Sequence, residues 1–435
     1  MPSVDTGAPV TAGASQPSFP TTGPPSGPTT GLTPGAAAAD RPADAPSTRR
    51  VNLALFALGL ATFALLFSTQ ALLPALSADF AVTPDAASWT ISAATIALAV
   101  CVLPLSMLSE RFGRQRLMTV SVAVAVGIAL VLPLAPDLGW LVALRTVQGA
   151  AIAGIPASAM AYLSEELRPR ALVGAIGLFV AGNSVGGMSG RIVTGWVAEG
   201  FGWRGALLVV GVMALVCAVA FRALLPKARN FTPSPLEPRA LARTVRDLLA
   251  NPLLVRLYAI GLLFMAVFGA VYTVIGYRLV AEPFGLSQGL VGSVFVIYLV
   301  GTGSSAASGG LVARLGRRGA LYLAIGTTAA GLLLTLSGNL VAVLAGLVLV
   351  TAGFFAGHTT ASSSVSRTVT TGRAQASALY QMAYYVGSSL GGTLGALAFH
   401  GGGWTATVAL ALTALVGAAG ITLYATRRAV RLAAA

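Results

Sequence analysis

Long apolar runs fill the chain after residue 50 and restrict its fold more than any other feature. We count twelve runs of about twenty residues, the length that lets a helix cross a hydrocarbon layer of about 30 Å. The composition agrees, because 56% of the 435 residues are hydrophobic and only 9% are charged. The runs are continuous and lack the alternation of β-barrel strands. The sequence therefore predicts an all-α integral membrane protein with twelve transmembrane helices.

Two sequence elements occur twice, in the same order. The charged turn at 106–114, SMLSERFGR, is echoed at 309–317 by GGLVARLGR. The glycine-rich stretch at 182–190, GNSVGGMSG, is echoed at 387–395 by GSSLGGTLG. The offsets, 316 − 113 = 203 and 387 − 182 = 205, are nearly equal. This indicates a duplicated half and predicts two pseudo-symmetric six-helix bundles, an arrangement typical of transporters.

The charge distribution predicts the orientation in the membrane. The net charge is +14, and of 27 basic residues all but Arg145, Arg191, Arg204 and Arg278 lie at or beyond one face of the predicted spans. Basic residues concentrate on the cytoplasmic side, so both termini are expected there. A nucleic-acid partner is not expected, since the basic linker has a simpler role at an anionic leaflet. The predicted organisation is a disordered cytoplasmic tail at 1–48, a six-helix bundle at 51–225, a cytoplasmic linker at 226–252, a second six-helix bundle at 253–427 and a cytoplasmic tail at 428–435.

The repeated motifs resemble those of the major facilitator superfamily (MFS). The turn at 106–116 resembles its signature between spans two and three, and 309–318 resembles the counterpart between spans eight and nine. The segment 145–149, RTVQG, is similar to its span-four motif, and 182–187 to the span-five motif of its antiporters. Stretches at 182–191, 277–279, 353–358 and 379–389 resemble a narrower branch, the YnfM-type (acriflavine-sensitivity) efflux permeases. The resemblance covers nearly all of the chain after residue 50.

The sequence departs from the superfamily pattern at four positions. Ser106 replaces the usual Gly and Glu110 the usual Asp in the first turn, while Ala313 replaces the acid of the second turn. Asn183 stands where antiporters usually have Pro. An acid-dependent latch is therefore expected to reside mainly in the first turn.

The resemblance implies a latch between helices at the inner face. Its cations are Arg111 and Arg114, and Glu166 is the expected partner because the family pattern Glu-x-x-Pro matches Glu166 to Pro169. The alternative is that Glu165 and Glu166 are solvated loop charges. The predicted inner-face gate consists of Glu110, Arg111, Gly113, Arg114, Glu166, Arg314, Gly316 and Arg317.

Glycines spaced by four share one face of a helix and let a neighbouring helix approach closely. We expect close packing, rather than ligand contact, to explain six of them. They are Gly182, Gly186, Gly190, Gly387, Gly391 and Gly395.

Charged and polar residues inside predicted spans are candidates for a substrate pathway. Arg145 and Arg191 lie within spans that have no acid at mid-depth, and such cations usually face a cavity or a partner. They either bind a polar or anionic group of the substrate or are held structurally by carbonyls or by acids at the ends of spans. His358, also within a span, either carries a coupling proton or simply packs. The predicted pathway comprises Gln70, Arg145, Gln148, Asn183, Arg191, Tyr272, Arg278, His358, Tyr384 and Tyr385.

The resemblance implies a secondary active transporter of the bacterial inner (plasma) membrane. We expect a monomeric antiporter that exports small amphipathic compounds or drugs in exchange for H⁺ by alternating access. The chain has no ATP-binding loop, and no cofactor or metal is expected. No catalytic spacing is found at membrane depth, so an enzyme is not expected. Two alternatives stay open: uptake or facilitated diffusion of an organic anion or other small metabolite, and a non-transporting membrane sensor.

Overall fold

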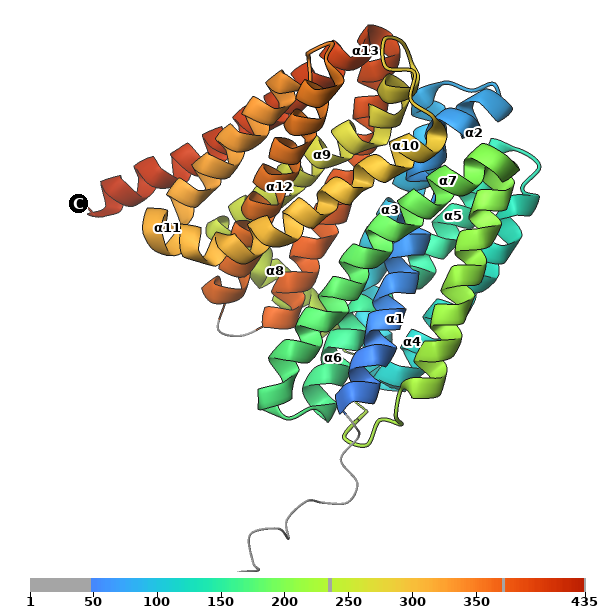
Figure 1. Cartoon of the computed structure of the whole chain (residues 1–435). Helices are drawn as coiled ribbons and strands as arrows, with labels where there is room; N and C mark the ends of the chain where they lie inside the picture. Colours follow the sequence, from blue (N-terminus) through green and yellow to red (C-terminus); the bar gives the residue numbers. More distant parts are fainter. Residues whose placement is uncertain (1–47, 234–236, 370–371, 434–435) are drawn as a thin grey trace, which may run out of the picture. The chain divides into compact units, whose positions relative to one another are not determined.

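The computed structural model describes residues 48–233, 237–369 and 372–433, without the side chains of 169, 173 and 425–433 (Figure 1). These residues are helical throughout, apart from short connections, and contain no strand. The predicted tail at 1–48 lies outside the described residues except for Thr48. The first half contains α1 (Thr48–Phe67), η1 (Gln70–Leu72), α2 (Leu73–Asp79), α3 (Pro84–Phe112), α4 (Arg114–Val131), η2 (Leu132–Leu134), α5 (Leu138–Ile152), α6 (Pro156–Glu166) and α7 (Pro169–Leu224). The second half contains α8 (Pro238–Ala250), α9 (Pro252–Val280), α10 (Gln288–Ser293), η3 (Val294–Ile297), α11 (Tyr298–Leu334), α12 (Leu340–Thr368) and α13 (Arg373–Ala433).

Local sequence signals set many of the helix starts. Pro84, Pro156 and Pro252 occupy the first turn of α3, α6 and α9, where the missing N–H of proline costs no hydrogen bond. The side chains of Asp137 and Asn339 accept hydrogen bonds from backbone N–H groups at the starts of α5 and α12, as expected of helix caps. Apolar runs therefore become helices that begin at defined residues.

Nine helical segments of the described chain are long and apolar enough to cross a membrane. Three of them are much longer than one crossing requires, because they span 55, 47 and 52 residues in α7, α10–α11 and α13. Each contains a glycine with non-helical backbone, namely Gly202, Gly316 or Gly403. The chain is thus a multi-pass membrane protein, and its longest helices are interrupted at glycine.

The repeated charged turns both change direction at a glycine. Gly113, between α3 and α4, has φ of 102°, and Gly316, within α11, has φ of 68°. Side chains with a Cβ rarely adopt these angles, whereas glycine does so at little cost. The two copies of the motif therefore share the same local structural requirement.

Six glycines lie where two pairs of helices are in backbone contact. In α7, a Cβ added to Gly186 would lie 2.2 Å from the Leu60 carbonyl oxygen of α1. In α13, a Cβ added to Gly391 would lie 2.1 Å from the Ala266 carbonyl oxygen of α9. A Cβ added to Gly182, Gly190, Gly387 or Gly395 would likewise lie within 2.2 to 2.8 Å of a backbone atom of the neighbouring helix. The duplicated glycine motif thus produces the same close packing twice.

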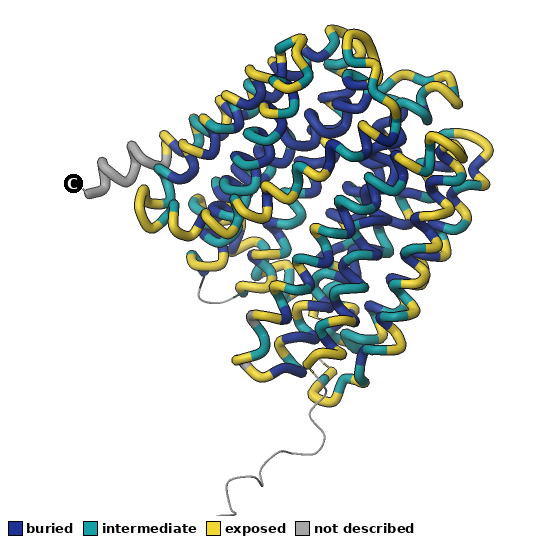
Figure 2. Tube along the Cα trace, in the orientation of Figure 1, coloured by how far each residue is buried: buried dark blue, intermediate teal, exposed yellow. Residues whose placement is uncertain are grey.

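Buried apolar residues form two clusters, which follow the two sequence halves (Figure 2). The first cluster contains residues from Val51 to Leu225 and adds Tyr385 from α13. The second contains residues from Leu248 to Ala418 and adds Ala71 from η1. Each half therefore has its own core, to which a few residues of the other half also contribute.

The predicted linker at 226–252 includes α8, whose Leu248 is buried in the second cluster. Residues 234–236 of the linker lie outside the described residues. Helix α13 continues beyond the predicted boundary at 427 and ends at Ala433, while 434–435 are not described.

Candidate functional site

A buried arginine lies at the point where the two halves meet. Arg191 of α7 is 2% exposed, and its Nε donates a 2.6 Å hydrogen bond to Oε1 of Gln70 in η1. A terminal nitrogen donates to the Gly187 carbonyl one turn earlier. The other terminal nitrogen makes no hydrogen bond within the described residues. The guanidinium is therefore held in position but retains donor capacity.

Three aromatic rings surround the Arg191 guanidinium. Its central carbon lies 4.3 Å from the ring centroid of Phe67 in α1, and 4.9 Å from the centroids of both Phe295 in η3 and Tyr298 in α11. Cation–π attraction is strongest when water is excluded, as it is here. Because Phe67 belongs to the first half and the other rings to the second, this cation links the two halves.

The aromatic contacts continue from Tyr298 deep into the second half. Tyr298 meets Tyr272 of α9 edge-on at 5.1 Å, and Tyr272 lies 4.5 Å from Phe268 one turn earlier. Phe268 stacks on Phe354 of α12 at 4.0 Å, and Phe355 meets both of these rings edge-on. We name this set the aromatic cluster: Phe67, Phe268, Tyr272, Phe295, Tyr298, Phe354, Phe355, His358, Tyr380, Tyr384 and Tyr385.

His358 occupies the far side of the aromatic cluster. Its ring stacks on Phe354 and lies 4.8 Å from the ring of Tyr384, which contacts Tyr385. The Tyr380 hydroxyl lies 3.0 Å from His358 Nδ1 and donates to the His358 carbonyl at 3.1 Å. His358 and Tyr384 are half-buried. The structure therefore gives this histidine a polar partner as well as packing contacts.

Arg145 and Gln148 lie apart from this cluster. Arg145 of α5 is fully buried and donates hydrogen bonds to the backbone carbonyls of Leu65 at 2.7 Å, Thr90 at 2.9 Å and Leu66. It also donates to Oε1 of Gln148, whose amide donates to the Ala125 carbonyl. These contacts join α5 to α1, α3 and α4. Backbone carbonyls therefore hold the Arg145 guanidinium, as in the second of the two alternatives for this cation.

Two further pathway candidates have other surroundings. Asn183 packs at the α1–α7 contact, where its buried Oδ1 has no partner within the described residues and would lie 2.6 Å from a Cβ added to Gly59. Arg278, near the end of α9, donates to the Ser337 carbonyl and lies 4.9 Å from the Trp404 ring centroid. The structure thus brings Gln70, Arg191, Tyr272, His358, Tyr384 and Tyr385 together, but not the other four candidates.

Hydrogen bonds join the two halves beside one end of the aromatic cluster. The Trp196 indole of α7 donates to the Ser293 hydroxyl at 2.9 Å, and the Glu199 carboxylate accepts from the Gly289 backbone N–H at 2.8 Å. The Tyr277 hydroxyl of α9 donates to the Leu73 carbonyl at 2.9 Å. This end of the molecule is closed in the structure.

The charged turn at the opposite end of α3 corrects one prediction. Arg114 pairs with Glu165, with Nε and Oε1 3.0 Å apart, and not with Glu166. The Glu166 carboxylate instead accepts hydrogen bonds from the backbone N–H groups of Arg229 at 2.7 Å and Asn230 at 2.9 Å. Successive residues of a helix point about 100° apart, so only one of the two carboxylates at the end of α6 faces α4. Glu166 therefore anchors the start of the linker.

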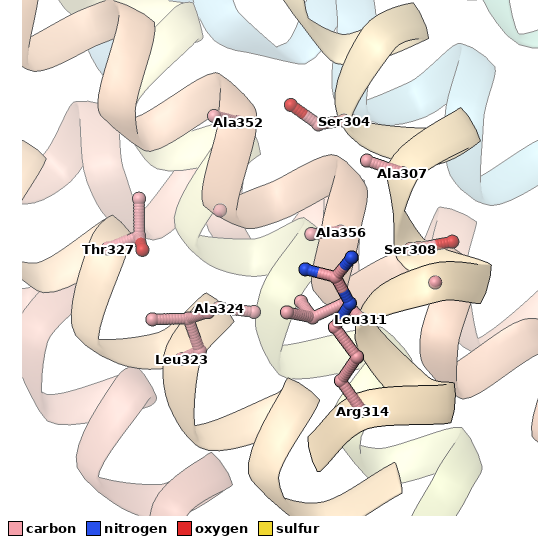
Figure 3. A pocket seen from close by; sticks show the side chains of 12 residues that line it. Ser304, Ala307, Ser308, Leu311, Arg314, Leu323, Ala324, Thr327, Ala352 and Ala356 are labelled. Atoms are coloured by element: carbon pink, nitrogen blue, oxygen red, sulfur yellow. The ribbon is translucent and has the colours of Figure 1, made fainter. Parts of the chain in front are cut away.

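The remaining members of the predicted gate have varied surroundings. Arg111 is exposed, and Glu110 is half-buried in the last turn of α3. Gly113 and Gly316 form the turns already described, and Arg317 is half-buried. Arg314 lines a cavity of about 490 Å³ between α11 and α12 (Figure 3). Its side chain lies among small lining residues that include Ser308 and Ala356.

Sequence reasoning missed several rings of the cluster as site residues. They are Phe67, Phe268, Phe295, Tyr298, Phe354, Phe355 and Tyr380. Aromatic pairs four residues apart within one apolar run, such as Phe268 with Tyr272 and Tyr380 with Tyr384, were an available signal because they share a helix face. Within the described residues, no group of three or more His, Cys, Asp or Glu is placed to hold a metal ion.

Comparisons with known proteins show which family and which solved fold this chain is similar to. The family model described as Major Facilitator Superfamily matches residues 53–279. The chain is 38% identical over 365 residues to the uncharacterized MFS-type transporter YybF of Bacillus subtilis (strain 168), covering 84% of this chain and 90% of that protein. It is 39% identical over 371 residues to the inner membrane transport protein YnfM of Escherichia coli (strain K12), covering 85% and 89%. A solved bacterial homolog to the human lysosomal transporter Spinster, in an inward-facing and unoccupied conformation, shares the fold with a TM-score of 0.73, 16% identity and coverage of 88% and 98%.

Proposed function

Because the chain belongs to the Major Facilitator Superfamily, we propose that it carries a small amphipathic solute across the membrane by alternating access. The relatives described above are transporters and not enzymes. The resemblance to this superfamily and to its YnfM-type branch is confirmed by these relatives. One observation carries the proposal. The Arg191 guanidinium of the first half lies between rings of both halves, so relative movement of the halves changes its surroundings.

The proposed architecture has twelve crossings. Division of the three longest apolar segments at Gly202, Gly316 and Gly403 adds three crossings to the nine segments. The proposed bundles are residues 51–225 and 253–427, each with its own buried cluster, joined by the linker at 226–252. Close packing at the glycines of α7 and α13 suits bundles that rock as units.

The proposed cycle alternates closure at the two ends. In this conformation, Trp196, Glu199 and Tyr277 close one end through contacts between the halves. The charged turn with Arg114 and Glu165 lies at the other end of α3, where we propose the inner-face gate. This assignment places both termini in the cytoplasm of a bacterial cell, with the chain acting as a monomer in the inner membrane.

The proposed direction is export in exchange for protons. His358 supports this proposal because an imidazole can take up and release a proton and this ring contacts the aromatic cluster through Phe354 and Tyr384. The Tyr380 hydroxyl, 3.0 Å from His358 Nδ1, is a polar neighbour with which this ring can exchange a hydrogen bond. A rigid aromatic surface also suits solutes with an apolar body and few polar atoms.

Proteoliposomes that contain the purified chain test the function and its coupling. Solutes of matched size are offered with and without a pH gradient, and accumulation against the solute's own gradient is measured. We expect accumulation that collapses with the pH gradient, and we expect His358→Gln to retain downhill exchange only. Downhill solute movement whose rate does not depend on the pH gradient would contradict proton antiport but not transport itself. Absence of movement for every solute would overturn transport.

Arg191 favours a second candidate, which is uptake or facilitated diffusion of an organic anion. No carboxylate of the described residues contacts this cation, so the site has a net positive charge. The same proteoliposomes distinguish this candidate, because its solute would equilibrate without a proton gradient.

A further inference from the structure

The Tyr298 hydroxyl is a buried polar group without a hydrogen bond. Its oxygen has no partner within the described residues, although the ring lies 4.9 Å from the Arg191 guanidinium carbon. A buried hydroxyl without a partner carries a desolvation cost that folding does not repay. Such a group beside a cation is most simply explained by a ligand that accepts its hydrogen bond.

The Arg191 guanidinium has a hydrogen-bond donor without an acceptor in the described chain. Its Nε and one terminal nitrogen are engaged by Gln70 and Gly187, and the second terminal nitrogen has no acceptor in the described chain. Hydrogen bonds from a guanidinium to an anionic acceptor are stronger than those to a neutral one. The open donors of Arg191 and Tyr298 therefore match a compact anion.

The aromatic faces argue against a cationic solute. Phe67, Phe295 and Tyr298 already direct their electron-rich faces to Arg191. An ammonium group would compete with the protein's own cation for these rings and would be repelled by it. Phe268, Tyr272 and Phe354 are almost fully buried, but the neighbouring rings of Phe355 and Tyr384 are half-buried and offer apolar contact area for a neutral ring system.

We propose that Arg191 and Tyr298 form an anion-binding subsite for the carboxylate of an aromatic acid, whose ring lies against the half-buried Phe355 and Tyr384. The proposal rests on the proposed transport function for its biological meaning, but the binding itself is measurable without transport. It names the substrate class as lipophilic organic anions and assigns a specificity role to Tyr298. Direction and coupling are not part of it.

Three probes of the same size test the subsite by calorimetric titration of the purified full chain in detergent. They are 2-naphthoate, 2-naphthamide and 2-naphthylmethylammonium. We expect naphthoate to bind about tenfold or more tightly than naphthamide, since a hydrogen bond to a charged group is the stronger one. The ammonium should bind most weakly. Equal binding of naphthoate and naphthamide, tighter binding of the ammonium, or no binding of any probe would overturn the proposal.

Tyr298→Phe is a selective variant because it removes only a hydroxyl that has no hydrogen bond in the structure. We expect it to weaken naphthoate binding about tenfold and to leave naphthamide binding unchanged. Tyr258→Phe is the matched control, since the Tyr258 hydroxyl is also buried without a partner but its ring has no contact with the aromatic cluster. Equal effects of the two variants on naphthoate binding would contradict the assignment.

Transport of the same probes separates failure of the subsite from failure of the function. Movement of the amide or the ammonium without movement of naphthoate would reject the subsite and leave transport standing. Naphthoate binding that responds to Tyr298→Phe, in a chain that moves no solute, would support the subsite and reject transport.

Discussion

The Glu199 carboxylate of α7 accepts a 2.8 Å hydrogen bond from the backbone N–H of Gly289 in the first turn of α10. A side chain of the first half thus caps a short helix of the second half. The nearby Trp196–Ser293 hydrogen bond joins the same two helices. Closure at this end therefore depends on a small number of polar contacts, each of which can be removed separately.

Glu199→Ala should make this end open more often, because α10 loses its carboxylate partner. The measurement is the rate at which an impermeant maleimide labels Ala71→Cys, introduced into a chain without Cys101 and Cys217. Ala71 is 1% exposed in the closed form. We expect labelling up to about fivefold faster, the range of a solvent-exposed ionic contact. Asp79→Asn is the control, since Asp79 bonds Trp203 and Arg204 within the first half; an equal effect there would contradict the role of Glu199.

Gly195→Ala should open the same end by steric means. A Cβ at Gly195 would lie 2.8 Å from both the Gln288 carbonyl oxygen and the Gly292 Cα, so α7 and α10 could not remain in contact. Labelling of Ala71→Cys should therefore become faster. Gly200→Ala is the matched control because nothing lies within 4 Å of its added Cβ. Unchanged labelling in Gly195→Ala would show that this contact does not hold the closed form.

Arg145→Met should destabilise the fold rather than alter solute choice. The substitution removes a charged hydrogen-bond donor from the buried carbonyls of Leu65, Leu66 and Thr90. The expected loss is about 3 kcal/mol or more of unfolding free energy, measured by denaturation in detergent mixtures. Arg111→Met is the control, because Arg111 is exposed. A stable Arg145→Met chain with altered solute preference would instead support a pathway role for Arg145.

Arg114→Glu should slow transport because it replaces the cation beside Glu165 with a second carboxylate, which repels the first. Restoration by the exchanged pair, Arg114→Glu with Glu165→Arg, would show direct coupling between the two side chains. Since this pair is partly exposed, we expect an effect of about fivefold on the transport rate. Arg317→Glu should have a smaller effect, because the second turn has Ala313 in place of an acid. Equal rates in all variants would remove the latch.

Glu166→Ala should release the start of the linker. The lost hydrogen bonds from the Arg229 and Asn230 backbone leave the segment free to open locally. Limited trypsin digestion at Lys227 and Arg229 should be about tenfold faster. Glu165→Ala, which removes the ion pair with Arg114, should change the digestion rate little. Equal digestion rates, or a faster rate in Glu165→Ala, would show that Glu166 does not anchor the linker.

Apolar runs and the repeated motifs were sufficient to predict a helical membrane fold. They were also sufficient to locate the glycines at the two charged turns. Gly113 and Gly316 are repeated because both turns need a positive φ. The choice between Glu165 and Glu166 depended on the rotation of α6 about its axis, which a short motif does not specify. Family patterns therefore indicated the helix turn that contacts Arg114 but not the residue that does so.

The aromatic cluster was only partly predictable. Tyr272, His358 and Tyr384 lie on three different helices, and their proximity follows from helix packing rather than from spacing in the sequence. Phe295 lies within a 3-10 segment that no periodicity indicated, and Tyr298 directly follows it. Arg145 and Arg191 looked alike in sequence, yet carbonyls surround the first and rings the second. Tertiary contacts decide such differences.

The crossing of α3 and α13 has a mechanical consequence. Ser92 and Ser389 exchange hydrogen bonds, each hydroxyl donating to the other's carbonyl at 3.2 and 3.0 Å. At 1.5 Å per residue, this crossing lies about 12 Å from the start of α3 at Pro84 and about 30 Å from its end at Phe112. If the serines act as a fulcrum, the two arms differ by more than twofold in length. A tilt of about 10° would then move the short arm by roughly 2 Å, enough to break the hydrogen bonds near it, and the long arm by roughly 5 Å, about the width of a small solute.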